Sequence, residues 1–99
     1  MIVLAGEISF KPEFREEGLR ACEAMLAPSR AEPGCLSHRF FEDPLLPGTI
    51  LFFEEWRSRQ DLDDHFAMEP FQKFAEQVGS WSAASPRIRI YSVSEHEDL

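Results

Sequence analysis

The chain has 99 residues, of which 43% are hydrophobic and 28% are charged, so it has room for one small globular domain. Eighteen acidic residues against ten Lys and Arg give a formal net charge of -8, which disfavours binding to nucleic acids and to anionic membrane surfaces. No apolar run approaches the roughly 20 residues that a membrane-spanning helix needs, so we expect no membrane segment.

The first third of the chain predicts a strand followed by a helix. Residues 2–10 alternate in hydrophobicity with a period of two, which is typical of a β-strand. Pro12 then stands at a helix start, where its missing N–H costs nothing. Apolar residues recur at helical spacing up to Ser29, although Pro28 should kink or end the helix. The Glu-Pro-Gly sequence at 32–34 predicts that this helix ends there at the latest.

Two further strands are predicted in the middle of the chain. Residues 35–42 and residues 50–57 both alternate with a period of two, and the second segment is the most hydrophobic strand. The connection between them, at 43–48, is rich in turn-forming residues and is too long for a two-residue hairpin.

The last third predicts an interrupted helix and a final strand. Ser58 is a favourable N-cap, and a helical stripe follows it until a break near residues 68–70. The stripe then resumes and continues to about Val78. Residues 79–86 are expected to form a loop, and residues 87–94 alternate as a strand.

The order strand–helix–strand–strand–helix–strand predicts an α+β protein with a ferredoxin-like split βαβ fold. Its helical segments would cover one face of a four-stranded antiparallel sheet. The other face would carry apolar side chains interleaved with arginines, namely Phe41, Leu51, Phe53, Tyr91, Val93, Arg39, Arg57 and Arg89. Because so short a chain has nothing left to cover this face, we expect a homodimer that joins the two open sheet faces. We assign residues 1–95 to the domain and residues 96–99 to a polar tail.

Three segments carry a resemblance to a known family. They are Pro-Ser-Arg-Ala-Glu-Pro-Gly-Cys-Leu at 28–36, Glu-Glu-Trp-Arg-Ser-Arg-Gln-Asp-Leu-Asp-Asp-His at 54–65 and Pro-Phe-Gln-Lys-Phe at 70–74. Together they resemble the antibiotic biosynthesis monooxygenase domain, and the resemblance covers essentially the whole chain. It implies a dimeric α+β barrel. The family includes cofactor-free oxygenases that form quinones and enzymes that degrade haem.

Two histidines are candidate catalytic bases. His65 borders the apolar stripe of the interrupted helix, and His38 shares a strand face with Phe40. A neutral imidazole at either position could remove a phenolic proton near pH 7. The alternative for His65 is a histidine at the rim that binds a backbone group.

Glu54 is the third candidate base. It lies between Phe52 and Trp56 on one face of its strand, where partial desolvation would raise its pKa. The alternative is a structural salt bridge between Glu54 and Arg39 or Arg89.

Aromatic side chains are candidates for binding a flat aromatic substrate. The resemblance implies that Trp56 borders the pocket, although it could equally be an ordinary core residue. The cofactor-free oxygenases also use an Asn four residues before this Trp, and the present chain has Phe52 there, which cannot donate a hydrogen bond. The predicted substrate-binding residues are Trp56, Phe52, Phe40, Phe66 and Phe74.

The sequence predicts neither a cofactor nor a metal site. The haem-degrading relatives use an Asn, a Trp and a His at positions that correspond here to Glu7, His65 and Ala75, and none of these matches. Cys22 and Cys35 do not stand at the spacing of metal ligands. Two cysteines without a basic leader segment indicate reduced thiols, so we expect a cytoplasmic protein.

We therefore expect a cofactor-independent monooxygenase that uses O2 to oxidise a small phenolic, hydroquinone or anthrone-like aromatic molecule to a quinone. The alternative is a protein of the same fold that binds a small aromatic ligand without turnover, which the loss of the Asn at position 52 favours. A third interpretation is a dimeric scaffold whose interior is filled by Phe side chains. A cavity of roughly 300 Å3 or more would favour a ligand over this last case.

Overall fold

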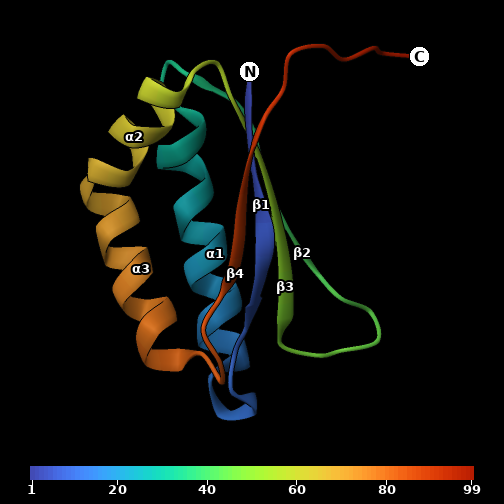
Figure 1. Ribbon diagram of the computed structural model, residues 1–99. Coiled ribbons are helices and arrows are strands. Elements are labelled where there is room, and N and C mark those ends of the chain that lie inside the picture. Colours follow the sequence, from blue (N-terminus) through green and yellow to red (C-terminus); the bar gives the residue numbers. More distant parts are fainter.

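In the computed structural model, which describes all 99 residues, a layer of helices lies against one face of a β-sheet (Figure 1). The elements in chain order are β1 (Ile2–Ser9), a 3-10 turn η1 (Pro12–Phe14), α1 (Arg15–Arg30), β2 (Cys35–Glu42), β3 (Thr49–Trp56), α2 (Arg59–Ala67), α3 (Glu69–Trp81) and β4 (Arg87–Ser92). This order confirms the predicted α+β, ferredoxin-like fold.

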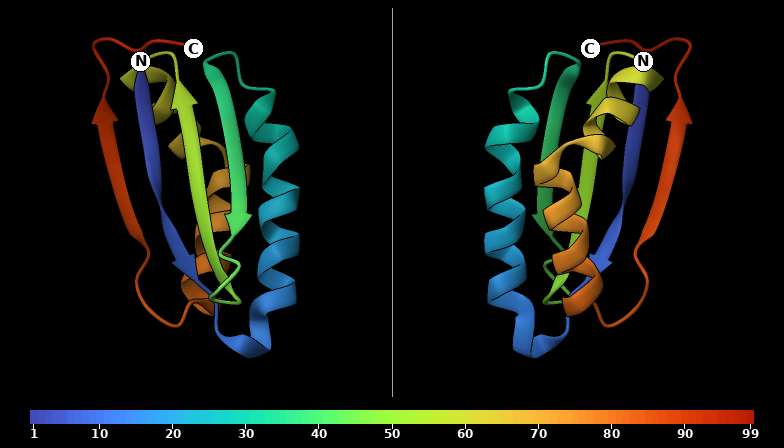
Figure 2. Two further views of the ribbon diagram at one scale, coloured as in Figure 1. Left: turned by 90° about the vertical axis from the view of Figure 1, so that its right-hand side faces the viewer. Right: turned by 90° about the vertical axis from the view of Figure 1, so that its left-hand side faces the viewer.

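The sheet places β3 and β1 at its centre, in the strand order β2-β3-β1-β4, and all neighbouring strands are antiparallel. In this register Glu54 of β3 lies between His38 of β2 and Leu4 of β1. The two views of Figure 2 show all three helices on the same side of the sheet, with α1 along the β2 edge. The β4 edge is the least covered, since every residue of β4 is exposed.

The predicted boundaries of the strands agree with the structure to within two residues, but two helices run further than expected. α1 continues through Pro28 to Arg30. Pro28 lies in the last turn, so its missing N–H deprives only the carbonyl of Ala24, an exposed residue, of its helical partner. α3 continues past Val78 to Trp81, whose ring stacks on Phe14 with the ring centroids 5.9 Å apart.

The break between α2 and α3 lies where the sequence predicts it. The Ser58 hydroxyl caps α2 and accepts a hydrogen bond of 3.2 Å from the backbone N–H of Asp61. Met68, between the two helices, has an extended backbone with ψ of 145°. Pro70 then occupies the first turn of α3, where a missing N–H costs little. α2 is thus a separate, short helix that covers one end of the sheet (Figure 1).

The core lies between the helices and the inner face of the sheet. Its buried members are Ile2, Leu4, Ile8, Phe10, Cys22, Ile50, Phe52, Trp56, Leu62 and Val78. The same layer holds four buried polar side chains, Ser29, His38, Glu54 and His65, none more than 5% exposed. Buried polar groups need hydrogen-bond partners, so this cluster is a candidate for a functional site.

The outer face of the sheet carries exposed apolar side chains. Phe41, Leu51, Phe53 and Tyr91 are each between 44% and 54% exposed. They alternate along their strands with residues that face the core, so they lie on the helix-free side of the sheet. The left view of Figure 2 shows this side of the sheet. None of the helices combines the length and the apolar character needed to cross a lipid bilayer.

The burial of Leu62 under the helices gives a prediction for stability. Leu62 has no exposed surface, so Leu62→Ala should lower the free energy of unfolding by about 2–5 kcal/mol through lost burial and a new cavity. Leu45, which is 86% exposed in the β2–β3 connection, is the matched control. Leu45→Ala should change the free energy of unfolding by less than about 0.5 kcal/mol. Urea unfolding of both variants measures the difference, and equal effects would contradict this packing.

Candidate functional site

A cavity of about 440 Å3 lies between the sheet and helices α2 and α3. Its lining is mostly apolar and aromatic and consists of Leu4, Ile8, Met25, His38, Phe40, Phe52, Glu54, His65, Phe66, Phe71, Phe74, Ala75, Val78, Gly79, Pro86 and Ile88. The exposed members of this lining, Ala75, Gly79 and Ile88, belong to α3 and β4, so the cavity meets solvent between these two elements. The Phe side chains line the space without filling it, and its size suits a small aromatic molecule.

The ionisable groups of the lining are His38, Glu54 and His65. Antiparallel pairing of β2 with β3 sets His38 beside Glu54, and α2 brings His65 over the same carboxylate. One carboxylate oxygen lies 3.4 Å from Nε2 of His38, and the other lies 3.8 Å from Nε2 of His65. The structure therefore brings the three predicted catalytic residues together in one cluster at the cavity.

The Glu54 carboxyl is almost completely buried, and burial raises its pKa to about 7. A hydrogen bond of 3.0 Å from the indole N–H of Trp56 opposes this shift, because it stabilises the charged form. The negative charge of Glu32 adds to the increase in pKa. A carboxyl with a pKa near neutrality can both accept and return a proton under physiological conditions.

His38 is held as a neutral imidazole. Its Nδ1 lies 2.6 Å from the hydroxyl of Ser29, which is fully buried on α1. Burial, together with the nearby His65 and Arg30, lowers the pKa of His38 to about 3. Its Nε2 is buried without a hydrogen-bond partner and faces Glu54. A polar atom without a partner at a cavity wall is available to a ligand.

His65 lies inside the protein, not at the rim. It is 1% exposed, and its ring packs on Trp56 with the ring centroids 4.6 Å apart. Its Nδ1 lies 2.7 Å from a carboxylate oxygen of Glu32, in the turn between α1 and β2. The alternative of a rim histidine bound to a backbone group does not describe this arrangement.

The side chains that contact the Glu54 carboxyl are the two imidazoles and the Trp56 indole, so the alternative of a salt bridge with Arg39 or Arg89 is not what the structure contains. Both arginines are exposed. They belong to the strand positions that alternate with His38 and Ile88 and therefore point to the outer face of the sheet.

Four of the five predicted substrate-binding residues, Phe40, Phe52, Phe66 and Phe74, line the cavity. The ring of Phe52 extends over the neighbouring strand β1, where its pairing partner is Gly6. Gly6 has no side chain, and a Cβ at this position would come within 2.8 Å of the Phe52 ring.

Trp56, the fifth predicted substrate-binding residue, has no exposed surface and lies outside the lining, behind Glu54 and His65. Its contact with the cavity is therefore indirect, through the carboxyl that it binds.

The structure adds three residues that sequence reasoning missed. Phe71 lines the cavity and shares the helical stripe of Phe74, so periodicity could have indicated it. Ser29 and Glu32 contact the two histidines, but they lie 9 and 33 residues from them in sequence, and no spacing rule connects them.

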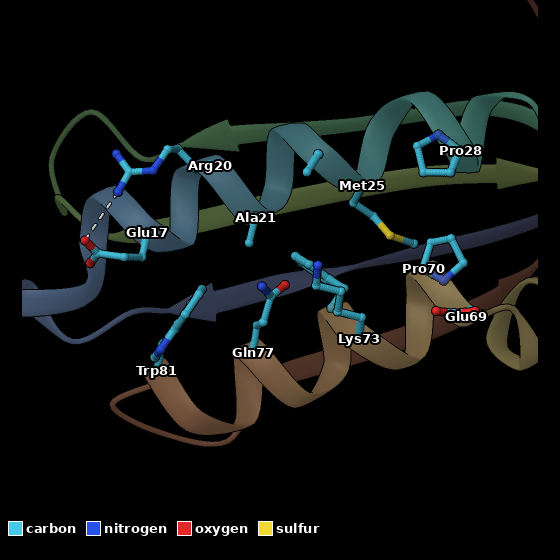
Figure 3. A pocket seen from close by; sticks show the side chains of 12 residues that line it. Glu17, Arg20, Ala21, Met25, Pro28, Glu69, Pro70, Lys73, Gln77 and Trp81 are labelled. Carbon is cyan, nitrogen blue, oxygen red and sulfur yellow. Dashed lines mark hydrogen bonds and ion pairs between the residues drawn. The ribbon is translucent and has the colours of Figure 1, made fainter.

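A second hollow, of about 600 Å3, runs between α1 and α3 (Figure 3). Figure 3 shows Arg20 and Glu17 of α1 paired at one end, and Lys73 and Gln77 extending from α3. It is more open and more polar than the cavity beneath the helices and holds no buried acid–base group. The cavity at Glu54 is therefore the stronger candidate site.

Neither a metal cluster nor an activated thiol accompanies the site. No group of three or more His, Cys, Asp and Glu side chains is arranged to hold a metal ion. Burial raises the pKa of Cys22 to about 12 and also raises the pKa of Cys35, so both thiols stay protonated.

Comparison with known proteins gives a consistent result. The profile of the family described as antibiotic biosynthesis monooxygenase matches residues 1–77. The uncharacterised protein sll1783 of Synechocystis is 41% identical over 98 residues, which are 99% of this chain and 67% of that protein. YcnE of Bacillus subtilis, provisionally named a monooxygenase, is 35% identical over 75% of this chain and 78% of its own. The solved structure of Rv0793 from Mycobacterium tuberculosis superimposes with a TM-score of 0.91 over 98% of both chains, at 25% identity.

The hydrogen bond between Trp56 and Glu54 gives a prediction for the pKa of Glu54. Trp56→Phe removes the N–H donor that stabilises the carboxylate, so the pKa of Glu54 should rise above about 7. Carboxyl carbon NMR titration measures this shift directly. Trp81→Phe, at the end of α3, is the control and should leave the titration of Glu54 unchanged. A pKa that stays constant or falls in Trp56→Phe would contradict the proposed contact.

Proposed function

This chain belongs to the antibiotic biosynthesis monooxygenase family, and from that membership we propose that it oxidises a small phenolic, hydroquinone or anthrone-like molecule to a quinone with O2 and without a cofactor. The observation that carries the proposal is a buried carboxyl with a pKa of about 7 at the wall of an aromatic cavity. A base of this kind can remove a phenolic proton at neutral pH, and the apolar walls keep water from the reactive anion.

Glu54 is the proposed base. Its carboxylate accepts the phenolic proton, and the resulting phenolate transfers one electron to O2, which gives a phenoxyl radical and superoxide. These two radicals combine at a hydrogen-bearing carbon para or, as in a hydroquinone, ortho to the oxygen, and the peroxide accepts a proton. Removal of the C–H proton at that carbon then breaks the O–O bond, so that one oxygen atom remains as the quinone carbonyl and the other leaves as water. The oxidation needs no further reductant, because the substrate supplies all of the electrons.

His38 has a proposed role in binding the substrate oxygen. It stays neutral because burial lowers its pKa to about 3, and its Nε2 has no partner in the protein. With the Ser29 hydroxyl donating to Nδ1, the proton of the imidazole lies on Nε2, where it can donate to a phenolate oxygen. Such a donor would take over part of the role of the Asn that the resemblance implies at position 52. The rings of Phe40 and Phe74 would stack on the substrate.

A second candidate function is the binding of a small aromatic ligand without turnover. Phe52 favours it, because this side chain offers no hydrogen bond to an oxygen intermediate at the position where the resemblance implies an Asn. A binding protein of this kind would be stabilised by hydroquinones and phenols without consuming O2.

We also propose that two copies of the chain associate through their outer sheet faces. Phe41, Leu51, Phe53 and Tyr91 form an exposed apolar surface on the helix-free side, and a second copy offers the same surface by two-fold symmetry. The arginines that alternate with these residues can pair with acidic side chains at the edge of such an interface.

Glu54→Gln tests the proposed base. The amide cannot accept the phenolic proton, so kcat for a responsive phenol or hydroquinone should fall roughly 100-fold or more in oxygen-electrode assays of metal-free protein. Glu23→Gln, an exposed charge on α1, is the matched control and should retain full activity. If no compound of a panel of phenols, hydroquinones and anthrones raises oxygen uptake above its autoxidation rate, the monooxygenase proposal is wrong. Thermal stabilisation by the same compounds would then support the binding function.

The pKa of Glu54 also sets the expected pH dependence. The active form of a general base is the carboxylate, which is protonated below its pKa. kcat/KM should therefore rise with pH through about 7 and level off above it. A profile that is flat between pH 5 and pH 8 would show that another group removes the proton.

Phe53→Asp tests the dimer. A charge at the centre of the outer face should weaken association, because it would be buried without a partner. Light scattering in dilute solution should give twice the 11.4 kDa of one chain for the unchanged protein and a smaller mass for the variant. Leu45→Asp, in the exposed connection, should remain dimeric. A folded, monomeric unchanged protein would refute the proposal.

A further inference from the structure

We propose that His65 and Glu32 form a proton relay between Glu54 and solvent, in which Glu32 is the positioning residue that orients the His65 ring. The inference rests on the proposed function and extends it to two residues beyond the base itself. It is based on a row of neighbouring polar atoms that leads from the cavity to the turn between α1 and β2. The row consists of the Glu54 carboxyl, the two ring nitrogens of His65 and the Glu32 carboxylate.

The contact with Glu32 determines how the His65 ring is used. Nδ1 of His65 lies 2.7 Å from Oε2 of Glu32. An ionised carboxylate can only accept a hydrogen bond, so Nδ1 carries the proton of the neutral ring and Nε2 carries the lone pair. Nε2 is the atom that faces Glu54, at 3.8 Å from Oε1. The ring is therefore oriented to receive a proton from Glu54 on one side and to release one to Glu32 on the other.

Exposure is greatest at the Glu32 end of this row, which identifies the end that meets solvent. The side chains of Glu54 and His65 are 6% and 1% exposed, whereas that of Glu32 is 14% exposed. The second imidazole offers no such path, because His38 leads only to the fully buried Ser29. Burial also lowers the pKa of His38 to about 3, which keeps that ring from carrying an extra proton.

A relay has a definite task in the proposed reaction. When substrate fills the cavity, a phenolic proton that stayed on Glu54 would return to the phenolate before O2 reacts. Transfer from Glu54 to Nε2 of His65, with loss of the Nδ1 proton to Glu32 and then to water, removes it. The peroxide later needs a proton, and transfer in the opposite direction supplies one and restores the Nδ1–H form of the ring. One proton leaves and one returns, in agreement with an overall reaction that neither releases nor consumes protons.

The 3.8 Å between Glu54 and His65 is longer than a hydrogen bond. The same oxygen, Oε1 of Glu54, accepts the indole N–H of Trp56 at 3.0 Å. A small rotation of the Glu54 side chain upon substrate binding closes the gap, and contacts of this kind commonly shorten when the substrate is bound.

Glu32→Gln tests the relay in the full chain. Gln keeps the size of the side chain but cannot take a proton, so kcat should fall about tenfold or more while KM stays within about twofold. Loss of the Glu32 charge also lowers the pKa of Glu54, which keeps His38, His65 and Trp56 as neighbours. The comparison should therefore be made on the alkaline plateau of the pH profile, where Glu54 is ionised in both proteins. Small imidazole or carboxylate buffers should restore kcat in a concentration-dependent way. Glu23→Gln should behave as the unchanged protein.

An unchanged kcat in Glu32→Gln, without any buffer effect, would overturn the relay even if the oxidation itself is observed. A second measurement does not depend on turnover: nitrogen NMR of His65, assigned with a His65→Asn variant, reports which ring nitrogen carries the proton. We expect protonated Nδ1 in the unchanged protein and a redistribution of the proton in Glu32→Gln. Protonated Nε2 in the unchanged protein would overturn the inference. Failure of every substrate to react would refute the proposed function alone, and the NMR result would then decide the orientation of His65.

Discussion

The carboxyl of Glu54 lies in the apolar layer between sheet and helices, and most of the site follows from the cost of placing it there. A lone charge in such a layer is strongly disfavoured, so the group retains its proton up to near-neutral pH and collects polar neighbours. Those neighbours come from three different elements: the indole N–H of Trp56 on β3, His38 on β2 and His65 on α2. The elements that enclose the hydrophobic core are thus the same elements that determine the acidity of this group.

Strand parity explains why much of the site could be predicted without coordinates. Alternation along residues 50–57 places Phe52, Glu54 and Trp56 on one face, and alternation along residues 35–42 places His38 and Phe40 on one face. If both strands belong to one sheet that is covered by helices, the Glu54 carboxyl must lie away from water, beside the His38 imidazole and several aromatic rings. The fold could be predicted for the same reason. Strand-like and helix-like hydrophobic patterns follow one another in an order that is compatible with few known folds.

The remaining features depend on contacts that no local pattern encodes. Glu32 reaches His65 across 33 residues, and only the packing of α2 against the α1–β2 turn brings them together. Burial of His65 follows from the angle at which α2 leaves Ser58, and a sequence stripe does not define that angle. Pro28 predicts a helix end, but tertiary packing carries α1 through it, since one missing hydrogen bond costs less than the contacts of the last turn.

The break at Met68 leaves α2 as a nine-residue helix that holds itself in place largely through its buried side chains. Helices this short are marginal by themselves, so detachment of α2 is a low-energy opening of the native state. Each such opening would let water reach Glu54 and return it to the ordinary acidity of a surface carboxyl. Proton transfer by Glu54 near neutral pH is therefore a property of the closed conformer alone. The fraction of time for which it is available depends on how firmly α2 stays attached to the rest of the protein.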